Sequence, residues 1–314
     1  GRGGEEPARG RTGAFGGATM IANYVVATRP WSFTAAAVPV GTTAAVLLSS
    51  GVAGVSFASL SFVHALALAI CVQAAANLTN SYFDFKNGID TDTPENGDRA
   101  LVDKTVTPTG VLILSTLLYL LSIALLVPKA LALSAGPSYL ALVAVFVVGL
   151  LLSFFYTASP VGFKYVALGD LVIFLCFGPL IMLCTSLLLT GELHPEVLPY
   201  SIPVGFLTEA ILHANNARDI KSDARAGIRT LAVLLGFKKS YALHMVFIFG
   251  SYVAALALCT QHWGCAATLL TLPIAVANVR AFRPNVESMR TLPEETAKLH
   301  LLWGALFILG IALT

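Results

Sequence analysis

Long apolar stretches recur along the chain from residue 31 to its end, with short polar segments between them. Nine stretches can be delimited: Trp31–Leu48, Ala58–Asp84, Val111–Val127, Ser138–Tyr156, Tyr165–Leu189, Pro199–Ala217, Ser240–Thr260, Ala266–Phe282 and Lys298–Leu313. Each approaches the roughly 20 apolar residues that a helix needs to cross a bilayer. The pattern predicts an all-α polytopic membrane protein with nine transmembrane helices, and it predicts kinks at Pro39, Gly178-Pro179 and Pro203.

Composition supports this prediction. Of the 314 residues, 56% are hydrophobic and 11% are charged, whereas a soluble domain carries about 25% charged residues. Nucleic-acid binders, secreted disulfide scaffolds and cytosolic enzymes are thereby excluded. The five cysteines show no metal-ligand or redox spacing and receive no role. Residues 1–23, rich in Gly and Arg at their start, are expected to form a disordered arm, and residues 24–314 a single membrane domain.

The basic residues fall almost entirely on one side of the predicted membrane. Of 19 Lys and Arg residues, only Lys129 lies in a loop that follows an odd-numbered stretch. Because basic loops stay in the cytoplasm, the crowded side is predicted to be cytoplasmic. Acidic residues gather on the same side, after the second and the sixth stretches, which suggests a functional site rather than a lipid anchor.

A narrow polar stripe runs along the second stretch. Its members recur every third or fourth position, so they share one helix face: Gln73, Asn77, Asn80 and Asp84. A polar seam that joins helices is the structural alternative. Because the stripe ends in a carboxylate at the cytoplasmic mouth, a functional role is favoured.

The sixth stretch repeats this arrangement. Its polar residues are Asn215, Asn216, Asp219 and Asp223, with Glu209 and His213 deeper in the bilayer. Asn80-x3-Asp84 and Asn215-x3-Asp219 have the same spacing, which predicts two helix ends that face each other at one mouth.

Facing carboxylates repel each other at low dielectric, and a hard divalent cation removes that cost. Mg²⁺ typically joins one or two carboxylates to substrate phosphates, so the two clusters suit a diphosphate held through two Mg²⁺ ions. Arg99, Lys164 and Arg218 are candidates to bind the phosphate oxygens that the metals leave free.

Two segments resemble the aspartate motifs of the UbiA superfamily of intramembrane prenyltransferases. They are Asn77-Leu-Thr-Asn80-Ser-Tyr-Phe-Asp84-Phe-Lys-Asn-Gly-Ile-Asp90 and Asn215-Asn-Ala-Arg-Asp219-Ile-Lys-Ser-Asp223. Further similar segments are Arg29-Pro-Trp-Ser32, Tyr156-Thr157, Gly162–Asp170 and Gly227–Ala232, and the likeness spans Tyr24 to Thr314. Many members place the second aspartate of the first motif four residues after the first, whereas here Asp90 follows Asp84 by six.

The resemblance implies nine helices around a central cavity with a cytoplasmic cap, and transfer of a prenyl group from an isoprenyl diphosphate to an aromatic acceptor. It is greatest to the branch that prenylates naphthoquinols and dihydroxynaphthoate. For the animal members, which Glu209–Asn215 and Gly162–Asp170 favour, it implies a geranylgeranyl donor and menaquinone-4 (vitamin K) as product. It also implies endoplasmic reticulum and Golgi membranes, and HMG-CoA reductase as a partner.

The resemblance assigns site roles on the matching positions. The metal ligands are Asn80, Asp84, Asp90, Asp219 and Asp223. The diphosphate contacts are Lys164, Arg99, Arg218, Asn215 and Asn216. Tyr156 is a candidate to shield an allylic cation with its ring, although an interfacial aromatic is the alternative. The acceptor side comprises Asn77, Asp170, Glu209 and His213, and Asp170 has orientation of Lys164 or a structural hydrogen bond as alternatives.

Other acceptors, 4-hydroxybenzoate or dihydroxynaphthoate, stay open. The main rival from another class is a divalent-cation transporter, which would place its carboxylates near the bilayer midplane on discontinuous helices. A CDP-alcohol phosphotransferase and an intramembrane aspartyl protease would need aspartate motifs that the sequence lacks.

Overall fold

The computed structural model describes residues 15–90, 99–133 and 135–314. Most of these residues are helical, and within them only an isolated bridge between Val166 and Arg229 has β pairing. Eight helices are long and apolar enough to span a membrane, and a ninth span results if Thr19–Ser32 and Thr34–Ser49, bent by 52°, count as one. The predicted all-α, polytopic fold is confirmed.

The helices follow the predicted stretches closely. Their bounds are α1 Phe15–Ala27, α2 Thr34–Ser49, α3 Leu60–Lys86, α4 Pro108–Ala132, α5 Pro137–Phe155, α6 Gly169–Leu175, α7 Ile181–Thr190, α8 Leu198–Arg218, α9 Ile220–Arg225, α10 Leu231–Ala257, α11 Leu272–Ala281 and α12 Val286–Ala312. Short helical turns precede or extend them: η1 Pro30–Ser32, η2 Phe163–Tyr165, η3 Cys176–Leu180, η4 Pro195–Val197, η5 Leu258–Thr260 and η6 Trp263–Thr271.

Of the predicted proline kinks, one interrupts a helix. The span that contains Gly178-Pro179 changes from α6 to the π-helical η3 and then to α7, because proline removes one hydrogen bond and a wider turn accommodates its ring. The assignments of α2 and α8 run unbroken through Pro39 and Pro203.

The predicted disordered arm needs a correction. Residues 1–14 lie outside the described residues, but residues 15–23 belong to α1. The side chain of Asn23 donates to the carbonyl of Thr105, and the hydroxyl of Tyr24 lies 3.1 Å from that of Thr107. These contacts attach α1 to the start of α4, a tertiary restraint that local composition does not reveal.

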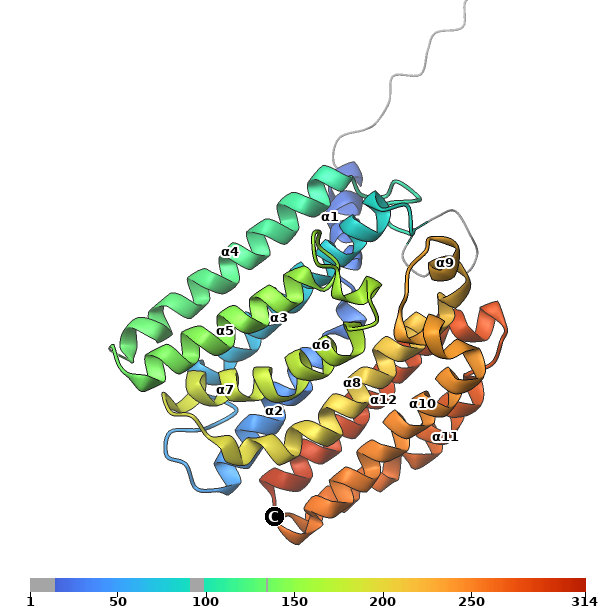
Figure 1. Cartoon of the computed structure of the whole chain (residues 1–314). Coiled ribbons are helices and arrows are strands. Elements are labelled where there is room, and N and C mark those ends of the chain that lie inside the picture. The colour runs from blue at the N-terminus through green and yellow to red at the C-terminus, as the bar shows by residue number, and fades with distance from the viewer. Residues whose placement is uncertain (1–14, 91–98, 134) are drawn as a thin grey trace, which may run out of the picture.

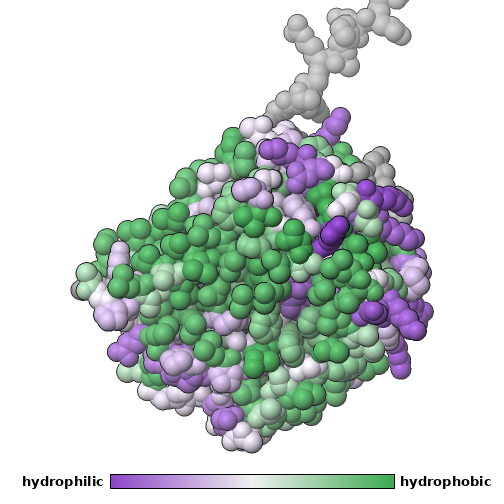
Figure 2. Space-filling model, viewed as in Figure 1, coloured by the Kyte–Doolittle hydropathy of each residue, from purple (hydrophilic) through white to green (hydrophobic). Residues whose placement is uncertain are grey.

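Helix α2 lies at the centre of the bundle, with α3–α7 on one side and α8–α12 on the other (Figure 1). It packs closely on α12, where a side chain larger than glycine at position 304 would meet Val38. The hydrophobic core around Trp303 and Phe307 is completely buried. Apolar surface covers most of the visible face, and hydrophilic residues gather at the end that carries α1 and α9 (Figure 2).

Candidate active site

The two aspartate-bearing helix ends open onto one cavity. Asp84 lies in the last turn of α3, and Asp219 ends α8 and precedes α9. The carboxylates of both motifs line a cavity of about 780 Å³, which we call the polar cavity. Its lining includes Asn80, Asp84, Asp90, Arg99, Lys164, Asn215, Arg218, Asp219 and Asp223. These nine residues, all candidates from the sequence, are thus brought together from distant parts of the chain.

Asp84 is paired with a buried lysine. The ammonium Nζ of Lys164 donates to Asp84 Oδ2 at 2.7 Å, and the Tyr165 hydroxyl donates to Asp84 Oδ1 at 2.9 Å. Burial lowers the pKa of Lys164, but the carboxylates of Asp84 and Asp223 raise it further, so the net pKa is above its ordinary value. Lys164 therefore stays charged, and it contacts Asp84 rather than Asp170.

The second motif has its own cation. The Arg218 guanidinium binds both carboxylate oxygens of Asp219 at 2.7 Å and also donates to Asn215 Oδ1. Arg99 pairs with Asp103, four residues along the chain, at the rim of the polar cavity. One carboxylate of each motif, that of Asp84 and that of Asp219, is therefore paired with a cation of the chain itself.

Two oxygens of the site have no protein partner. In the described part of the chain, no hydrogen bond reaches Asn80 Oδ1 or Asp223 Oδ2, although both atoms are buried and both residues line the polar cavity. Burial raises the pKa of Asp223 to about 7, and repulsion by Asp219 and Asp84 contributes to this rise. Buried oxygens without donors suit a hard cation such as Mg²⁺.

Metal ligands are not fully assembled by protein side chains alone. Within residues 15–90, 99–133 and 135–314 there is no group of three or more His, Cys, Asp or Glu side chains placed to hold an ion. This fits Mg²⁺, which typically uses one or two carboxylates and completes its shell with water and substrate phosphate.

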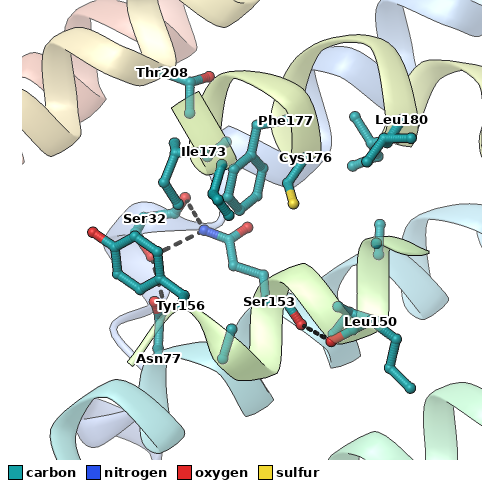
Figure 3. A pocket seen from close by; sticks show the side chains of 18 of the residues that line it. Ser32, Asn77, Leu150, Ser153, Tyr156, Ile173, Cys176, Phe177, Leu180 and Thr208 are labelled. Carbon is teal, nitrogen blue, oxygen red and sulfur yellow. Dashed lines mark hydrogen bonds between the residues drawn. The ribbon is translucent and has the colours of Figure 1, made fainter. Parts of the chain in front are cut away.

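A second, apolar cavity continues from the polar one into the bundle. Its volume is about 190 Å³, and Arg29, Trp31, Asn80, Lys164 and Asn215 line both cavities. Helices α3, α5, α6, α7 and α8 form its walls. Figure 3 shows the rings of Tyr156 and Phe177 and the side chains of Ile173 and Leu180 around this space. We call it the apolar cavity.

Tyr156 forms part of the wall of the apolar cavity. Its hydroxyl is buried and has no hydrogen-bond partner among the described residues. Burial, followed by the charges of Asp170 and Glu209, raises the pKa of Tyr156 well above its ordinary value. The side chain is therefore a neutral phenol whose ring borders the cavity.

The deeper acceptor-side candidates lie behind the walls. Asp170 Oδ1 is 3.4 Å from His213 Nδ1, and His213 Nε2 is 3.1 Å from the carbonyl oxygen of Ser240. Glu209 is 1% exposed. These three residues line neither cavity, and neither does Asn216. Of the acceptor-side candidates, Asn77 alone lines the apolar cavity.

Part of the polar stripe of α3 joins segments of the bundle, which is the structural alternative that the sequence had left open. Asn77 Nδ2 donates to the carbonyl of Thr28 and to Ser32 Oγ, and Gln73 Nε2 donates to the carbonyl of Ser32. These bonds hold the bend between α1 and α2, where Arg29 has a left-handed backbone with φ 55°. Arg29 and Tyr165 are further residues of the site, and only their place in motifs similar to the family could have indicated them.

The fold, the paired aspartate motifs and the two joined cavities define the chain as an integral-membrane prenyltransferase. It belongs to the UbiA prenyltransferase family, whose sequence profile matches residues 37–302.

The chain is 41% identical to human UbiA prenyltransferase domain-containing protein 1 over 294 residues, which cover 93% of this chain and 84% of that protein. It is 40% identical to the Xenopus tropicalis protein of the same name over 293 residues, 93% of this chain and 82% of that protein. Among solved structures, a UbiA homolog from Archaeoglobus fulgidus bound to GPP and Mg²⁺ superposes with a TM-score of 0.57. The identity is 15%, and the match covers 91% of this chain and 99% of that one.

Proposed function

We propose that the chain transfers a geranylgeranyl group from its diphosphate to a naphthoquinol, with Mg²⁺, and so makes menaquinone-4 or a related prenylquinone. One observation carries this proposal: two aspartate-bearing helix ends share a polar cavity that continues into an apolar cavity. A charged diphosphate fits the first space and an isoprenyl tail the second. The names of the human and Xenopus relatives, and the GPP and Mg²⁺ bound to the Archaeoglobus homolog, support the coarser part of this proposal, which is Mg²⁺-dependent prenyl transfer.

The residues at the mouth suit two Mg²⁺ ions and a diphosphate. Asn80, Asp84, Asp90, Asp219 and Asp223 would supply the oxygens for the metals, since all five line the polar cavity. Asn80 and Asp84 lie on α3, and Asp219 and Asp223 lie at the end of α8 and on α9. When bound, Mg²⁺ would neutralise the charge that develops on the departing diphosphate.

The cations of the mouth suit the phosphate oxygens. Lys164 and Arg218 neutralise Asp84 and Asp219, and a diphosphate would offer both cations another anionic partner. We assign them to the diphosphate together with Arg29, Arg99 and Asn215, which line the same cavity. Because Arg29, Lys164 and Asn215 border both cavities, they fix the diphosphate where the tail enters the apolar space.

The apolar cavity is assigned to the carbon skeletons of the two substrates. Departure of the diphosphate leaves an allylic cation, and the neutral ring of Tyr156 borders the space where this cation would form. Its walls keep water away from the cation, so that the electron-rich acceptor ring attacks instead. The ring then loses a proton and regains its aromaticity.

The placement of the carboxylates argues against the transporter alternative. They lie at helix ends beside Lys164 and Arg218 rather than halfway along discontinuous helices. By the distribution of Lys and Arg, we place the polar cavity on the cytoplasmic side. Residence in the endoplasmic reticulum and Golgi, and HMG-CoA reductase as a partner, remain proposals from family likeness, which co-purification from cell membranes would test.

The decisive experiment incubates the purified protein in lipid nanodiscs with Mg²⁺, geranylgeranyl diphosphate and one of three acceptors, with product identification by mass. The acceptors are 2-methyl-1,4-naphthoquinol, 1,4-dihydroxy-2-naphthoate and 4-hydroxybenzoate. We expect the prenylated naphthoquinol, and none with Asp219→Asn or with EDTA. Absence of product from all three acceptors, combined with Mg²⁺ flux into liposomes, would support the transporter and overturn the proposal.

A further inference from the structure

Gln73 carries a buried oxygen without a donor on the wall of the apolar cavity. The side chain is 5% exposed and lines this cavity. Its Nε2 donates to the carbonyl oxygen of Ser32 at 2.7 Å and to Ser32 Oγ at 3.2 Å. Its Oε1 has no hydrogen-bond partner among the described residues. A buried carbonyl oxygen left without a donor is unfavourable, which calls for an explanation.

The orientation of this amide is determined by its surroundings. The backbone carbonyl of Ser32 can only accept a hydrogen bond, so the nitrogen of Gln73 must face it. Rotation of the amide by 180° would place two carbonyl oxygens against each other. Oε1 is therefore the atom that remains available, and what it requires is a donor.

The side-chain donors of Ser32 and Asn77, which share hydrogen bonds with the Gln73 side, are already engaged. The hydroxyl of Ser32 donates to the carbonyl of Arg29 at 2.8 Å, and Asn77 Nδ2 donates to Thr28 and Ser32. Ser32 and Asn77 both line this cavity, as Tyr156 does (Figure 3). A bound molecule with an O–H group would supply the donor that Gln73 lacks.

The depth of Gln73 suits the aromatic acceptor. It precedes Asn80 by seven residues on α3, which corresponds to a rise of about 10 Å along the helix. If the diphosphate is held at the level of Asn80 and Asp84, this distance accommodates the allylic carbon and one aromatic ring system. A hydroxyl on that ring then comes within reach of Gln73.

Resting on the proposed function, we infer that Gln73 is a specificity-determining residue: its Oε1 accepts a hydrogen bond from a ring hydroxyl of the aromatic acceptor. A carboxylate substituent at the same position has no proton to donate, and its charge would face a carbonyl oxygen in an apolar space. Gln73 thus favours a neutral hydroxyl-bearing ring over a carboxylated one. The cations that line this cavity, Arg29 and Lys164, lie where it joins the polar cavity.

The test measures competitive inhibition of naphthoquinol prenylation by ligands that differ in one hydroxyl. Two naphthols, 2-methyl-1-naphthol and 3-methyl-1-naphthol, each lack one of the two hydroxyl groups of the quinol 1,4-dihydroxy-2-methylnaphthalene. Their inhibition constants are compared with each other and with the KM of the quinol. In the natural protein, loss of the hydroxyl that faces Gln73 weakens binding about tenfold. In Gln73→Leu this difference between the two naphthols disappears, whereas the KM for geranylgeranyl diphosphate changes less than twofold.

Thr79→Val is the matched control. It removes a buried hydroxyl of α3 that bonds Ser115 Oγ and lines neither cavity, and it leaves Gln73 and Ser32 in place, so the difference between the naphthols persists. An equal loss of discrimination in Thr79→Val would show that a change in the packing of α3 suffices to remove it and would overturn the inference.

The natural protein alone gives a second test that no folding defect can obscure. Equal binding of both naphthols, or a higher kcat/KM for 1,4-dihydroxy-2-naphthoate than for the neutral quinol, overturns the assignment of Gln73 while prenyl transfer itself stands. Absence of prenylated product from every acceptor would instead refute the proposed function.

Discussion

At the mouth of the site, a few buried charges neutralise one another in the absence of substrate. The side chains of Lys164 and Asp84 are 7% and 6% exposed, and their charged atoms lie 2.7 Å apart. Removal of one member of such a pair leaves the other buried and uncompensated, which costs more than the pair contributes. The pair is therefore a structural element as well as a candidate part of the chemistry.

This predicts a separation of stability from activity. Asp84→Asn should destabilise the folded protein by about 3–5 kcal/mol, because Lys164 then lacks its counter-charge. The double variant Asp84→Asn with Lys164→Met should recover most of the lost melting temperature and still transfer no prenyl group. Thermal unfolding and product mass in the same nanodisc preparation check both results. Prenyl transfer by the double variant would show that the reaction does not need the Asp84 carboxylate.

The protonation of Asp223 is expected to make Mg²⁺ binding depend on pH. Burial raises its pKa to about 7, so in the ligand-free protein a proton occupies this carboxylate below that pH. Mg²⁺ requires the ionised form. The apparent affinity for Mg²⁺ should therefore fall up to tenfold per pH unit below about 7 and level off above it.

Titration of the ligand-free protein with Mg²⁺ and inorganic diphosphate at pH 5.5, 6.5 and 7.5 measures this dependence. In Asp223→Asn, binding should be weaker and should lose this pH dependence. A profile that is the same in both proteins would show that another group titrates.

Sequence analysis identified the carboxylates but not their partners. Asp84 and Asp219 were recognised because carboxylates at apolar helix ends are unusual. Tyr165 looked like the first residue of a transmembrane stretch, yet its hydroxyl donates to Asp84. Gln73 was noted as part of a stripe, but its unsatisfied oxygen depends on the position of Ser32, 41 residues away. Such partnerships arise only from tertiary packing.

At the level of helices, hydropathy located the spans, and Gly178-Pro179 indicated the one break that the structure shows at a predicted proline kink. The late start of the sixth span was not predicted: the stretch Tyr165–Leu189 was expected to be helical from Tyr165, whereas α6 begins at Gly169. The stretch Ala266–Phe282 begins within the 3₁₀ segment η6. Apolar composition reports burial in the bilayer, whereas these changes in helix type depend on local hydrogen bonds and close packing.

Close packing of α2 on α12 gives a prediction for whole helices. A Cβ atom at Gly304 would overlap both methyl groups of Val38, so Gly304→Ala should destabilise the protein by about 1–3 kcal/mol. Val38→Ala in the same chain should restore most of the loss. Gly149→Ala in α5 is the control, since nothing lies within 4 Å of an added Cβ there. Equal melting temperatures for Gly304→Ala and Gly149→Ala would contradict this packing.

Across the whole molecule, the candidate site is where the two groups of helices on either side of α2 come together. Asp84 and Lys164 come from the α3–α7 group and Asp219 and Asp223 from the α8–α12 group, and all four line the polar cavity. A ligand that contacts both groups ties them together. Because such a ligand binds only the folded protein, it stabilises the fold by mass action.

This predicts a thermal shift that needs both components of the proposed ligand. A non-hydrolysable prenyl diphosphate analogue at about 100 times its Kd should stabilise the protein by about 2.7 kcal/mol when Mg²⁺ is present. With EDTA the shift should nearly vanish, because the diphosphate then faces uncompensated carboxylates. Mg²⁺ alone should give a small shift, since described protein side chains do not complete a metal site. Melting curves of the natural protein and of Asp219→Asn are measured under all three conditions. A full shift with EDTA, or an undiminished one in Asp219→Asn, would mean that the diphosphate binds elsewhere than between the two aspartate motifs.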